Sequence, residues 1–247
     1  MPRYFIEVAY KGTQYSGFQI QHNAVTIQSE VEKVLAVYYR NQFELTGSSR
    51  TDAGVHARQN YFHFDTHINL QQQHTYNLNA ILPEDIVIEK IYPMDNEAHC
   101  RFDAVSRKYQ YFIYQDKNPF LQDRAWFYPY TIDVTMLNTF AKALQSYQDF
   151  TSFSKRNTQV KNFNCKILES YWKEENDCLV YTVEANRFLR GMVRALVSTM
   201  LKLCKQNDAV LKLEQIILSK DCTNADFTAP SQGLFLQQVN YPQGYFK

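Results

Sequence analysis

Short segments in which polar and apolar residues alternate are the clearest pattern in this chain, and they predict β-strands. Residues 3–11 place an apolar side chain at every second position, so these side chains should share one face of a sheet. Residues 61–66 alternate in the same way, which predicts a half-buried strand. Further strand-like segments lie at 42–47, 86–92, 107–114, 166–174, 179–185 and 234–239.

Other segments carry apolar residues at the three- and four-residue spacing of a helix. The first predicted helix begins near Ile27, with Thr26 as its N-cap. A second, over residues 70–81, should end before Pro83. The longest apolar stripe predicts the strongest helix, over residues 188–203. Two more helices are expected at 134–147 and 208–218.

Strands and helices alternate irregularly along the chain, and the closely spaced strands imply antiparallel pairing. This combination predicts an α+β fold with an antiparallel or mixed sheet. The order of elements is similar in residues 1–105 and 106–247, and no Pro-, Gly- or Ser-rich linker separates them. We therefore expect an N-terminal and a C-terminal half packed as one unit.

The composition is that of a globular protein, with 247 residues of which 45% are hydrophobic and 21% are charged. No stretch approaches the roughly 20 apolar residues that span a bilayer, and the N-terminus lacks the apolar region of a signal peptide. The five scattered cysteines form no C-x-x-C pair, which argues against a zinc ribbon and suits reduced thiols. These features predict a cytoplasmic protein that does not bind a membrane.

Basic residues are locally concentrated, although the net charge is only +1. Binding to a polyanion requires a local basic surface rather than a high net charge. An aromatic content of 15% suits stacking on bases as well as core packing. Any single basic run is usually a solvated face, but several of them make RNA binding plausible. The runs are Arg101, Arg107 and Lys108; Lys155, Arg156, Lys161 and Lys166; and Arg187, Arg190 and Arg194, followed by Lys202 and Lys205.

The sequence Ser-Arg-Thr-Asp-Ala-Gly-Val-His-Ala at residues 49–57 places charged groups on a short connection between two predicted strands. Asp52 follows Arg50 by two residues, where rigid elements would hold a reactive carboxylate. A plain turn is the alternative, with Asp52 bonding to the backbone ahead of it and Gly54 supplying a positive φ. Considered alone, the segment is ambiguous.

The whole string closely resembles the G-R-T-D-x-G-V-H-A signature of the TruA family of tRNA pseudouridine synthases, with Ser49 in place of the usual glycine. Further segments match that family in the same order, so the resemblance covers nearly the whole chain. A departure lies at 146–153, where the glycine and histidine that often precede T-S-F are absent. The matching segments are 10–21 (Y-x-G-T-x-Y-x-G-W-Q-x-Q, with Phe18 for Trp), 26–28 (T-V-Q), 102–111 (F-x-A-x-x-R-x-Y-x-Y), 188–194 (F-L-R-x-M-V-R) and 229–236 (A-P-x-x-G-L-x-L).

The resemblance implies the pseudouridine synthase fold, with two similar α/β halves, helices flanking antiparallel or mixed sheets, and a central active-site cleft. It implies an isomerase that converts uridine to pseudouridine in the anticodon stem–loop of tRNA, at tRNA positions 38, 39 and 40. It also suggests a homodimer that binds one tRNA across both subunits and assembles its basic surface from two chains. The reaction is a redox-neutral isomerisation and requires no cofactor.

Within this family Asp52 corresponds to the essential carboxylate, the expected nucleophile. Breaking the N1–C1′ bond and rejoining the base through C5 requires an ionised carboxylate beside C1′ or C6, as a nucleophile or as a base. A guanidinium should pair with it, and Arg190 or Arg194 on the predicted helix is favoured over Arg50. The alternative for the two helix arginines, spaced four residues apart, is a solvent-facing helix edge.

Tyr109 is expected in the pocket, where its ring can stack on the extruded uracil and its phenol can assist proton removal from C5. Arg50 is expected to contact the RNA backbone or to help displace the base. His56 is expected to fix the loop by hydrogen bonding rather than to act in catalysis. The full set of expected substrate-binding residues is Arg50, Tyr109, Arg187, Arg107 and Lys108.

Two other functions are weighed against this one. A non-catalytic RNA-binding or RNA-chaperone protein on the same fold would not need a buried ionised carboxylate beside a polyanion. A nucleoside hydrolase would usually require a second carboxylate or a metal to activate water. The six histidines show no convincing metal-ligand spacing, and His63 and His67 should face solvent from a strand, so no metal site is expected.

Overall fold

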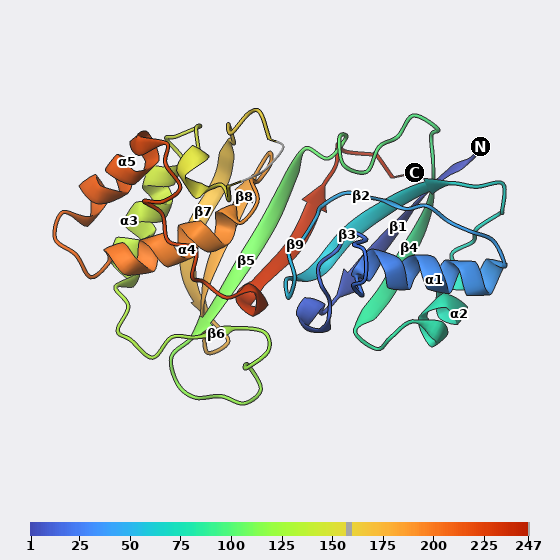
Figure 1. Ribbon diagram of the computed structural model, residues 1–247, viewed down its shortest axis with the longest axis horizontal. Helices are drawn as coiled ribbons and strands as arrows, with labels where there is room; N and C mark the ends of the chain where they lie inside the picture. Colours follow the sequence, from blue (N-terminus) through green and yellow to red (C-terminus); the bar gives the residue numbers. More distant parts are fainter. Residues whose placement is uncertain (157–159, 247) are drawn as a thin grey trace. The chain divides into compact units, whose positions relative to one another are not determined.

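The computed structural model describes residues 1–156 and 160–246, and the chain forms two compact units (Figure 1). The first unit comprises Met1–Val105 and Phe235–Lys247, and the second comprises Ser106–Leu234. The sequence-based division lies at the first of these boundaries, but it grouped residues 235–247 with the second half. The second unit is therefore an insertion between two segments of the first.

The sheet of the first unit is built around β1 (Arg3–Tyr10). This strand pairs antiparallel with β3 (His56–Asp65) on one side and with β4 (Ile86–Met94) on the other. Two strands share the other edge of β3: β2 (Thr46–Gly47) pairs antiparallel near its end, and β9 (Leu234–Asn240) pairs parallel near its start. The sheet is therefore mixed, as the sequence predicted.

Helix α1 (Ile27–Tyr39) begins at the predicted residue because Thr26 caps it. The Thr26 hydroxyl accepts the N–H of Ser29 at 3.2 Å, and the Ser29 hydroxyl accepts the N–H of Thr26 at 2.9 Å, which forms a capping box. Helix α2 (His74–Ile81) begins at His74 rather than at residue 70, because the polar residues 71–73 add nothing to its apolar stripe. Figure 1 shows α1 and α2 beside one another along the sheet.

Both faces of the first unit's sheet are covered. On one face Phe62 stacks on Phe18, with ring centroids 4.4 Å apart. On the other face Tyr61 contacts Tyr241 at 5.3 Å and Phe246 at 5.4 Å. Asn60 and the four residues after it are consequently all buried. The prediction of a half-buried strand was wrong, because the C-terminal aromatic residues cover the face that alternation assigned to solvent.

The sheet of the second unit contains the predicted antiparallel strands. β8 (Cys178–Ala185) pairs with β5 (Ser106–Tyr114) on one side and with β7 (Ile167–Glu175) on the other. A two-residue turn at Asn176 and Asp177, with φ of 48° and 62°, closes the hairpin between β7 and β8. The short strand β6 (Trp126–Phe127) pairs parallel with the end of β5.

Three helices gather on one side of this second sheet (Figure 1). Helix α3 (Val134–Leu144) packs against β7, and the Asp133 side chain caps it by accepting the N–H of Met136 at 2.9 Å. Helix α4 (Met192–Leu203) contacts β5 and α5 (Ala209–Ser219).

Helix α4 starts later than its apolar stripe predicted. Gly191, just before the helix, has φ of +76°, so the chain turns there instead of continuing a helix from residue 188. Arg190 therefore precedes the helix, whereas Arg194 lies in its first turn. The alternative in which the two arginines share one solvent-facing helix edge is therefore excluded, since Arg190 lies outside α4.

Each unit combines a sheet with helices, which confirms the predicted α+β class. Among residues 1–156 and 160–246, no helix is both long enough and apolar enough to cross a membrane. All five cysteines are present as thiols rather than as disulfides.

Candidate active site

Asp52 lies on the connection between β2 and β3, and it is half-buried. The N–H of Val55 donates to the Asp52 carbonyl oxygen at 3.2 Å, and Gly54 has φ of +77°. The segment is thus a tight turn, as the alternative interpretation of the sequence required. The turn and a catalytic role are compatible, because the turn fixes the backbone and leaves part of the Asp52 residue accessible.

Thr51, the residue before Asp52, is held from two sides. Its carbonyl oxygen accepts the N–H of Phe18 at 3.1 Å, and its hydroxyl lies 2.8 Å from the Tyr10 hydroxyl. Gly17 has φ of +105°, and a Cβ at this position would lie 3.2 Å from the Thr51 carbonyl oxygen. The loop before α1 can therefore approach the Asp52 loop closely only because residue 17 is glycine.

Asn60, which is fully buried in β3, connects the start of the Asp52 loop with Tyr10 of β1. Its amide nitrogen donates to the Ser49 carbonyl oxygen at 2.9 Å and to the Tyr10 hydroxyl at 3.2 Å. Its amide oxygen accepts the N–H of Tyr61 at 2.9 Å. One side chain thus links the strand to both the start of the Asp52 loop and the residue that holds Thr51.

His56 fixes the far end of the loop. Its Nδ1 accepts the N–H of Gly12 at 3.1 Å, and its ring stacks on Phe235 with centroids 4.4 Å apart. A Cβ on Gly12 would lie 2.0 Å from the Val55 carbonyl oxygen, so this position admits only glycine without a shift of the backbone. The hydrogen-bonding role expected for His56 is confirmed.

Ser49 and Arg50 precede Asp52 and differ in exposure. Arg50 is exposed, as an RNA contact requires, whereas Ser49 is buried. Within the described part of the chain, the buried Ser49 hydroxyl has no hydrogen-bond partner. The family's usual glycine at this position would remove that unpaired group.

Tyr109 lies in β5 of the second unit, opposite Val183 of β8, and is half-buried. Its ring packs edge-to-face on Phe188, with centroids 5.0 Å apart and planes at 82°. Phe188 belongs to the segment that leads into α4, so the expected aromatic residue and the expected arginine segment are held together within the second unit. The edge-to-face contact sets the tilt of the Tyr109 ring.

Two basic residues that precede Tyr109 in β5 form ion pairs or hydrogen bonds within the second unit. Lys108 forms ion pairs with Glu169 at 2.6 Å and with Glu184 at 3.4 Å. The hydrogen bond with Glu169 is the main cause that raises the pKa of Lys108. Arg107 donates to the Asn186 carbonyl oxygen at 3.4 Å. Lys108 keeps its positive charge, but Glu169 and Glu184 compensate much of it. Its attraction for a phosphate group is therefore weaker than that of an unpaired lysine.

The three arginines around the start of α4 have different surroundings. Arg194 is half-buried, and its Nε donates to the Ala229 carbonyl oxygen at 2.6 Å. Arg190 is exposed, and its carbonyl oxygen accepts the N–H of Lys155 at 3.0 Å. Arg187 is half-buried, and its charge opposes the burial that raises the pKa of the Cys165 thiol to about 11.

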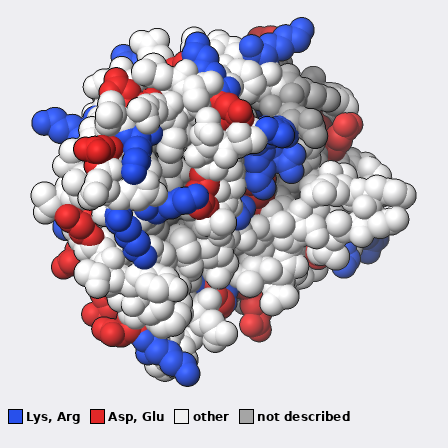
Figure 2. Space-filling model, turned by 60° about the vertical axis from the view of Figure 1, so that its left-hand side comes forward, with Lys and Arg blue, Asp and Glu red and all other residues white. Residues whose placement is uncertain are grey.

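Basic and acidic groups are mixed on the face of the second unit that Figure 2 brings forward. Lys and Arg side chains gather in one compact group there, and elsewhere they alternate with Asp and Glu. Lys220 pairs with Asp149 at 2.9 Å, and Arg156 approaches Asp221 at 3.7 Å. The charge that the second unit offers to a polyanion is therefore smaller than its number of basic residues suggests.

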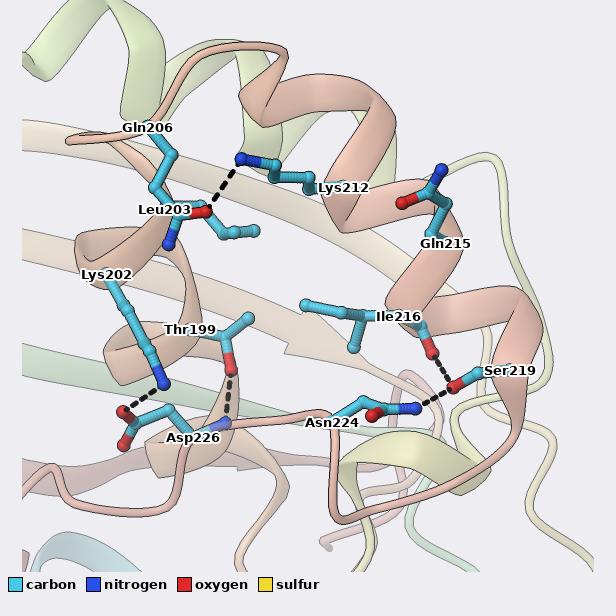
Figure 3. Close-up of a pocket in the computed structure, with 10 residues that line it drawn as sticks. All are labelled: Thr199, Lys202, Leu203, Gln206, Lys212, Gln215, Ile216, Ser219, Asn224 and Asp226. Carbon is cyan, nitrogen blue, oxygen red and sulfur yellow. Dashed lines mark hydrogen bonds and ion pairs between the residues drawn. The ribbon is translucent and has the colours of Figure 1, made fainter.

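A polar cavity lies between α4, α5 and residues 224–226 of the second unit (Figure 3). Lys202 lies 3.7 Å from Asp226, and Lys212 donates to the Gln206 side chain at 3.0 Å. Its polar groups bond to one another, and none of the site residues expected from the sequence lines it. We therefore do not assign this cavity to the reaction.

Comparison with known proteins identifies the family to which the chain belongs. The family model described as tRNA pseudouridine synthase matches residues 6–103 and 140–242, which is well over half of the chain. The chain belongs to the tRNA pseudouridine synthase family. A relative from Parabacteroides distasonis, named tRNA pseudouridine synthase A, is 41% identical over 252 residues and covers 100% of this chain and 98% of its own length.

Other members of the tRNA pseudouridine synthase family with the same name are similar over nearly full length. One from Bacteroides fragilis is 41% identical over 249 residues, covering 99% of this chain and 98% of the relative. One from Staphylococcus aureus strain Newman is 36% identical over 240 residues, covering 96% of this chain and 90% of the relative. The resemblance drawn from the sequence motifs is thereby confirmed.

The sequence of this family member did not lead us to predict the side chains that hold the Asp52 loop. Tyr10 was expected as an apolar position of a strand and as the first residue of the matching segment 10–21, but not as a support of the Asp52 loop, and Asn60 was not singled out. A carboxamide at the start of the apolar run of β3 was the available signal, since a buried amide must find hydrogen-bond partners. The sequence alone offers no means of naming Ser49 and Tyr10 as those partners.

Proposed function

We propose that this protein isomerises uridine to pseudouridine in the anticodon stem–loop of tRNA, at tRNA positions 38, 39 and 40, with Asp52 as the essential carboxylate. The observation that carries the proposal is the Asp52 turn. Three separate parts of the first unit brace it: Tyr10 of β1, Phe18 of the loop before α1, and Asn60 of β3. Membership of the tRNA pseudouridine synthase family supports the reaction.

The reaction needs one well-positioned carboxylate. Asp52 serves as the nucleophile while the N1–C1′ bond breaks, and the retained base is rejoined to C1′ through C5. Glycosidases use two carboxylates in order to admit water to the sugar. An isomerase must retain the displaced base and exclude water, so a single carboxylate on a rigid turn fits this chemistry.

Residues of the second unit serve the same reaction in this proposal. Tyr109 stacks on the extruded uracil and assists proton removal from C5, and its contact with Phe188 supports a fixed ring. Arg190 and Arg194 are the candidate partners of the Asp52 carboxylate. The proposed substrate contacts are made by Arg50, Arg107, Lys108 and Arg187.

We also propose a cytoplasmic homodimer in which one tRNA contacts both subunits. The net charge of +1 supports this arrangement, because a single chain carries little excess positive charge. Light scattering on the purified protein should give twice the chain mass of 29.1 kDa. A monomer at that mass, in the presence and absence of tRNA, would exclude the dimer.

The decisive experiment is pseudouridine formation in an unmodified tRNA transcript, with wild type and Asp52→Asn compared. We expect the wild type to form product at positions 38–40, and the variant to bind tRNA without forming product. Asp177→Asn is a matched control, because Asp177 is exposed in a turn with φ of 62°, which asparagine tolerates. Tight tRNA binding without product from the wild type, across several tRNAs, would favour the non-catalytic RNA-binding protein.

A further inference from the structure

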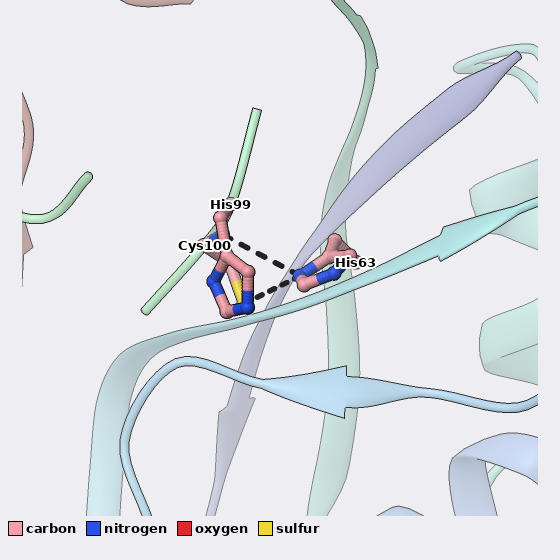
Figure 4. Close-up of side chains that lie close together, drawn as sticks. All are labelled: His63, His99 and Cys100. Atoms are coloured by element: carbon pink, nitrogen blue, oxygen red, sulfur yellow. Dashed lines mark hydrogen bonds between the residues drawn. The ribbon is translucent and has the colours of Figure 1, made fainter. Parts of the chain in front are cut away.

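A compact group of His63, His99 and Cys100 lies in the first unit, outside the segment that carries Asp52 (Figure 4). His63 belongs to β3, and the other two follow β4. One potential ligand atom of each side chain lies within 4.8 Å of the other two. The expectation that His63 faces solvent was wrong, since only 6% of its surface is exposed and Cys100 is fully buried.

The segment that carries His99 and Cys100 is held in place by several hydrogen bonds. Arg3 donates to the Ala98 carbonyl oxygen at 2.8 Å, and Tyr241 donates to the Cys100 carbonyl oxygen at 2.5 Å. The Asp103 carboxylate accepts the N–H of His99 at 2.8 Å. The three side chains therefore converge on a rigid frame, as a binding site requires.

The geometry of the group is close to that of a zinc site. His63 Nδ1 lies 3.1 Å from Cys100 Sγ. Zinc bound tetrahedrally by an imidazole nitrogen and a thiolate holds these two atoms roughly 3.5 Å apart. A small opening of the pair therefore admits the ion. Imidazole and thiolate form a ligand set that suits zinc and disfavours magnesium or calcium.

The Nε2 atom of His99 is the candidate ligand atom of this residue. Its Nδ1 accepts the N–H of Arg101 at 3.1 Å and the N–H of Phe102 at 3.4 Å. Figure 4 shows the other side of the ring turned toward His63. Coordination through Nε2 places a proton on Nδ1, so the turn at residues 101–102 must readjust when the metal binds.

We propose that His63, His99 and Cys100 bind one Zn²⁺ ion, with water completing a tetrahedral site. The Cys100 thiol, which donates to the Thr46 carbonyl oxygen at 3.2 Å, loses its proton to solvent on binding. The ion ties the segment after β4 to β3 through His63, and the hydrogen bond from Cys100 to Thr46 of β2 is lost together with the thiol proton. His63 lies about 23 Å along β3 from His56 by the rise of a strand, so the site is separate from the Asp52 loop.

The first test uses the full-length protein after removal of metal with a chelator, and titrates it with Co²⁺ as a spectroscopic probe for zinc. We expect d–d bands of a tetrahedral site together with a thiolate-to-metal charge-transfer band, and stoichiometric displacement of cobalt by Zn²⁺. Equilibrium dialysis with elemental analysis should find one zinc ion per chain. Thermal unfolding should shift to higher temperature with zinc, because the ion binds only the folded state.

Variants assign the ligands. Cys100→Ser should remove the charge-transfer band and weaken zinc binding by at least about tenfold, and His99→Gln should weaken binding without removing that band. Cys165→Ser is the matched control, because Cys165 is another buried thiol, with 1% of its surface exposed. It should bind zinc as the wild type does.

The proposal is overturned if the wild type shows no stoichiometric zinc binding, or if Cys100→Ser binds zinc and cobalt as the wild type does. If Cys100→Ser fails to fold, His99→Gln decides the matter, since His99 is only half-buried. Unchanged affinity and an unchanged thermal shift in that variant would exclude the site. These readouts do not involve catalysis, so they stand apart from the test of Asp52.

Discussion

Asp52 is held by side chains that lie outside its own motif. Thr51 contacts Tyr10 of β1, and Asn60 of β3 contacts both Tyr10 and the Ser49 carbonyl oxygen. None of these side chains needs to touch RNA. A shift of about 1 Å in a reacting group costs on the order of 100-fold in rate, so the network around Asn60 should matter for turnover.

Asn60→Ala should lower kcat by roughly 10- to 100-fold through displacement of the Asp52 loop. It should also reduce the free energy of unfolding by about 1–3 kcal/mol, because the buried partners lose their hydrogen bonds. Single-turnover pseudouridine formation and urea unfolding measure the two effects. Tyr10→Phe, which removes only the hydroxyl, should show a smaller loss of the same kind. Wild-type turnover in both variants would show that the network does not position Asp52.

Ser49→Ala should stabilise the protein. The Ser49 hydroxyl is buried, and in the described part of the chain it has no hydrogen-bond partner. Removing an unpaired buried hydroxyl should therefore increase the free energy of unfolding by up to about 1 kcal/mol. Urea unfolding of the variant measures this, and turnover should be unchanged because Asn60 contacts only the backbone of residue 49. A destabilised variant would indicate that an ordered water satisfies the hydroxyl.

At the scale of elements, local signals in the sequence predicted most helices and strands. α1 begins where Thr26 predicted it, and β7 and β8 pair as expected. The errors arise where non-local contacts or backbone geometry decide. Gly191 delays the start of α4 although the apolar stripe continues through it. The strand expected at 42–47 is reduced to Thr46–Gly47, since only these residues reach β3.

The candidate site was predictable to a similar extent. The motif at 49–57 placed Asp52 on a turn between strands, and the structure describes such a turn. The brace by Tyr10 and Asn60 depends on side chains that are 50 residues apart in sequence. The group of His63 with His99 depends on the fold in the same way. Spacing rules detect ligands on one element and miss those that the fold brings together.

The ends of β1 and β3 are joined by an ion pair whose strength should depend on pH. Arg3 binds Asp65 through two hydrogen bonds of 2.8 Å, and this contact is the main cause that holds the pKa of Asp65 below its usual value of 3.8. A carboxyl group with a lowered folded-state pKa stabilises the fold above its unfolded-state pKa. That stabilisation is lost as the pH falls through the folded-state value.

Asp65→Asn should therefore reduce stability at pH 7 and have a smaller effect at about pH 3. The loss at pH 7 should stay below about 1 kcal/mol, because 39% of the Asp65 side chain is exposed and solvent screens the pair. Urea midpoints of wild type and variant at the two pH values test this. A difference between them that does not shrink on acidification would rule out the ion pair as its cause.

At the scale of the whole molecule, the end of the chain completes the core of the first unit. Phe246 contacts Phe5 of β1 at 6.2 Å, Tyr61 of β3 at 5.4 Å and Tyr92 of β4 at 4.4 Å. Three strands thus share one aromatic residue from the C-terminal segment. The stability of the sheet depends on residues that are more than 140 positions away in sequence from any of these strands.

Phe246→Ala should reduce the free energy of unfolding by about 1–3 kcal/mol, less than the cost at a fully buried phenylalanine, because Phe246 is only half-buried. Phe120→Ala is the matched control, since 78% of Phe120 is exposed and its loss should change stability little. Thermal or urea unfolding compares the two. Equal effects would mean that the C-terminal aromatic contacts do not support the sheet.

The insertion of the second unit into the first has a consequence for synthesis on the ribosome. Ser106–Leu234 is one continuous segment, so the second unit can fold as soon as that segment has emerged. The first unit starts earlier, yet its β3 edge lacks β9 and its aromatic face lacks Tyr241 and Phe246 until residues 235–246 leave the exit tunnel. The Asp52 loop therefore reaches its final support last, and a nascent chain that has emerged from the tunnel only as far as residue 234 holds a finished second unit and an unfinished first.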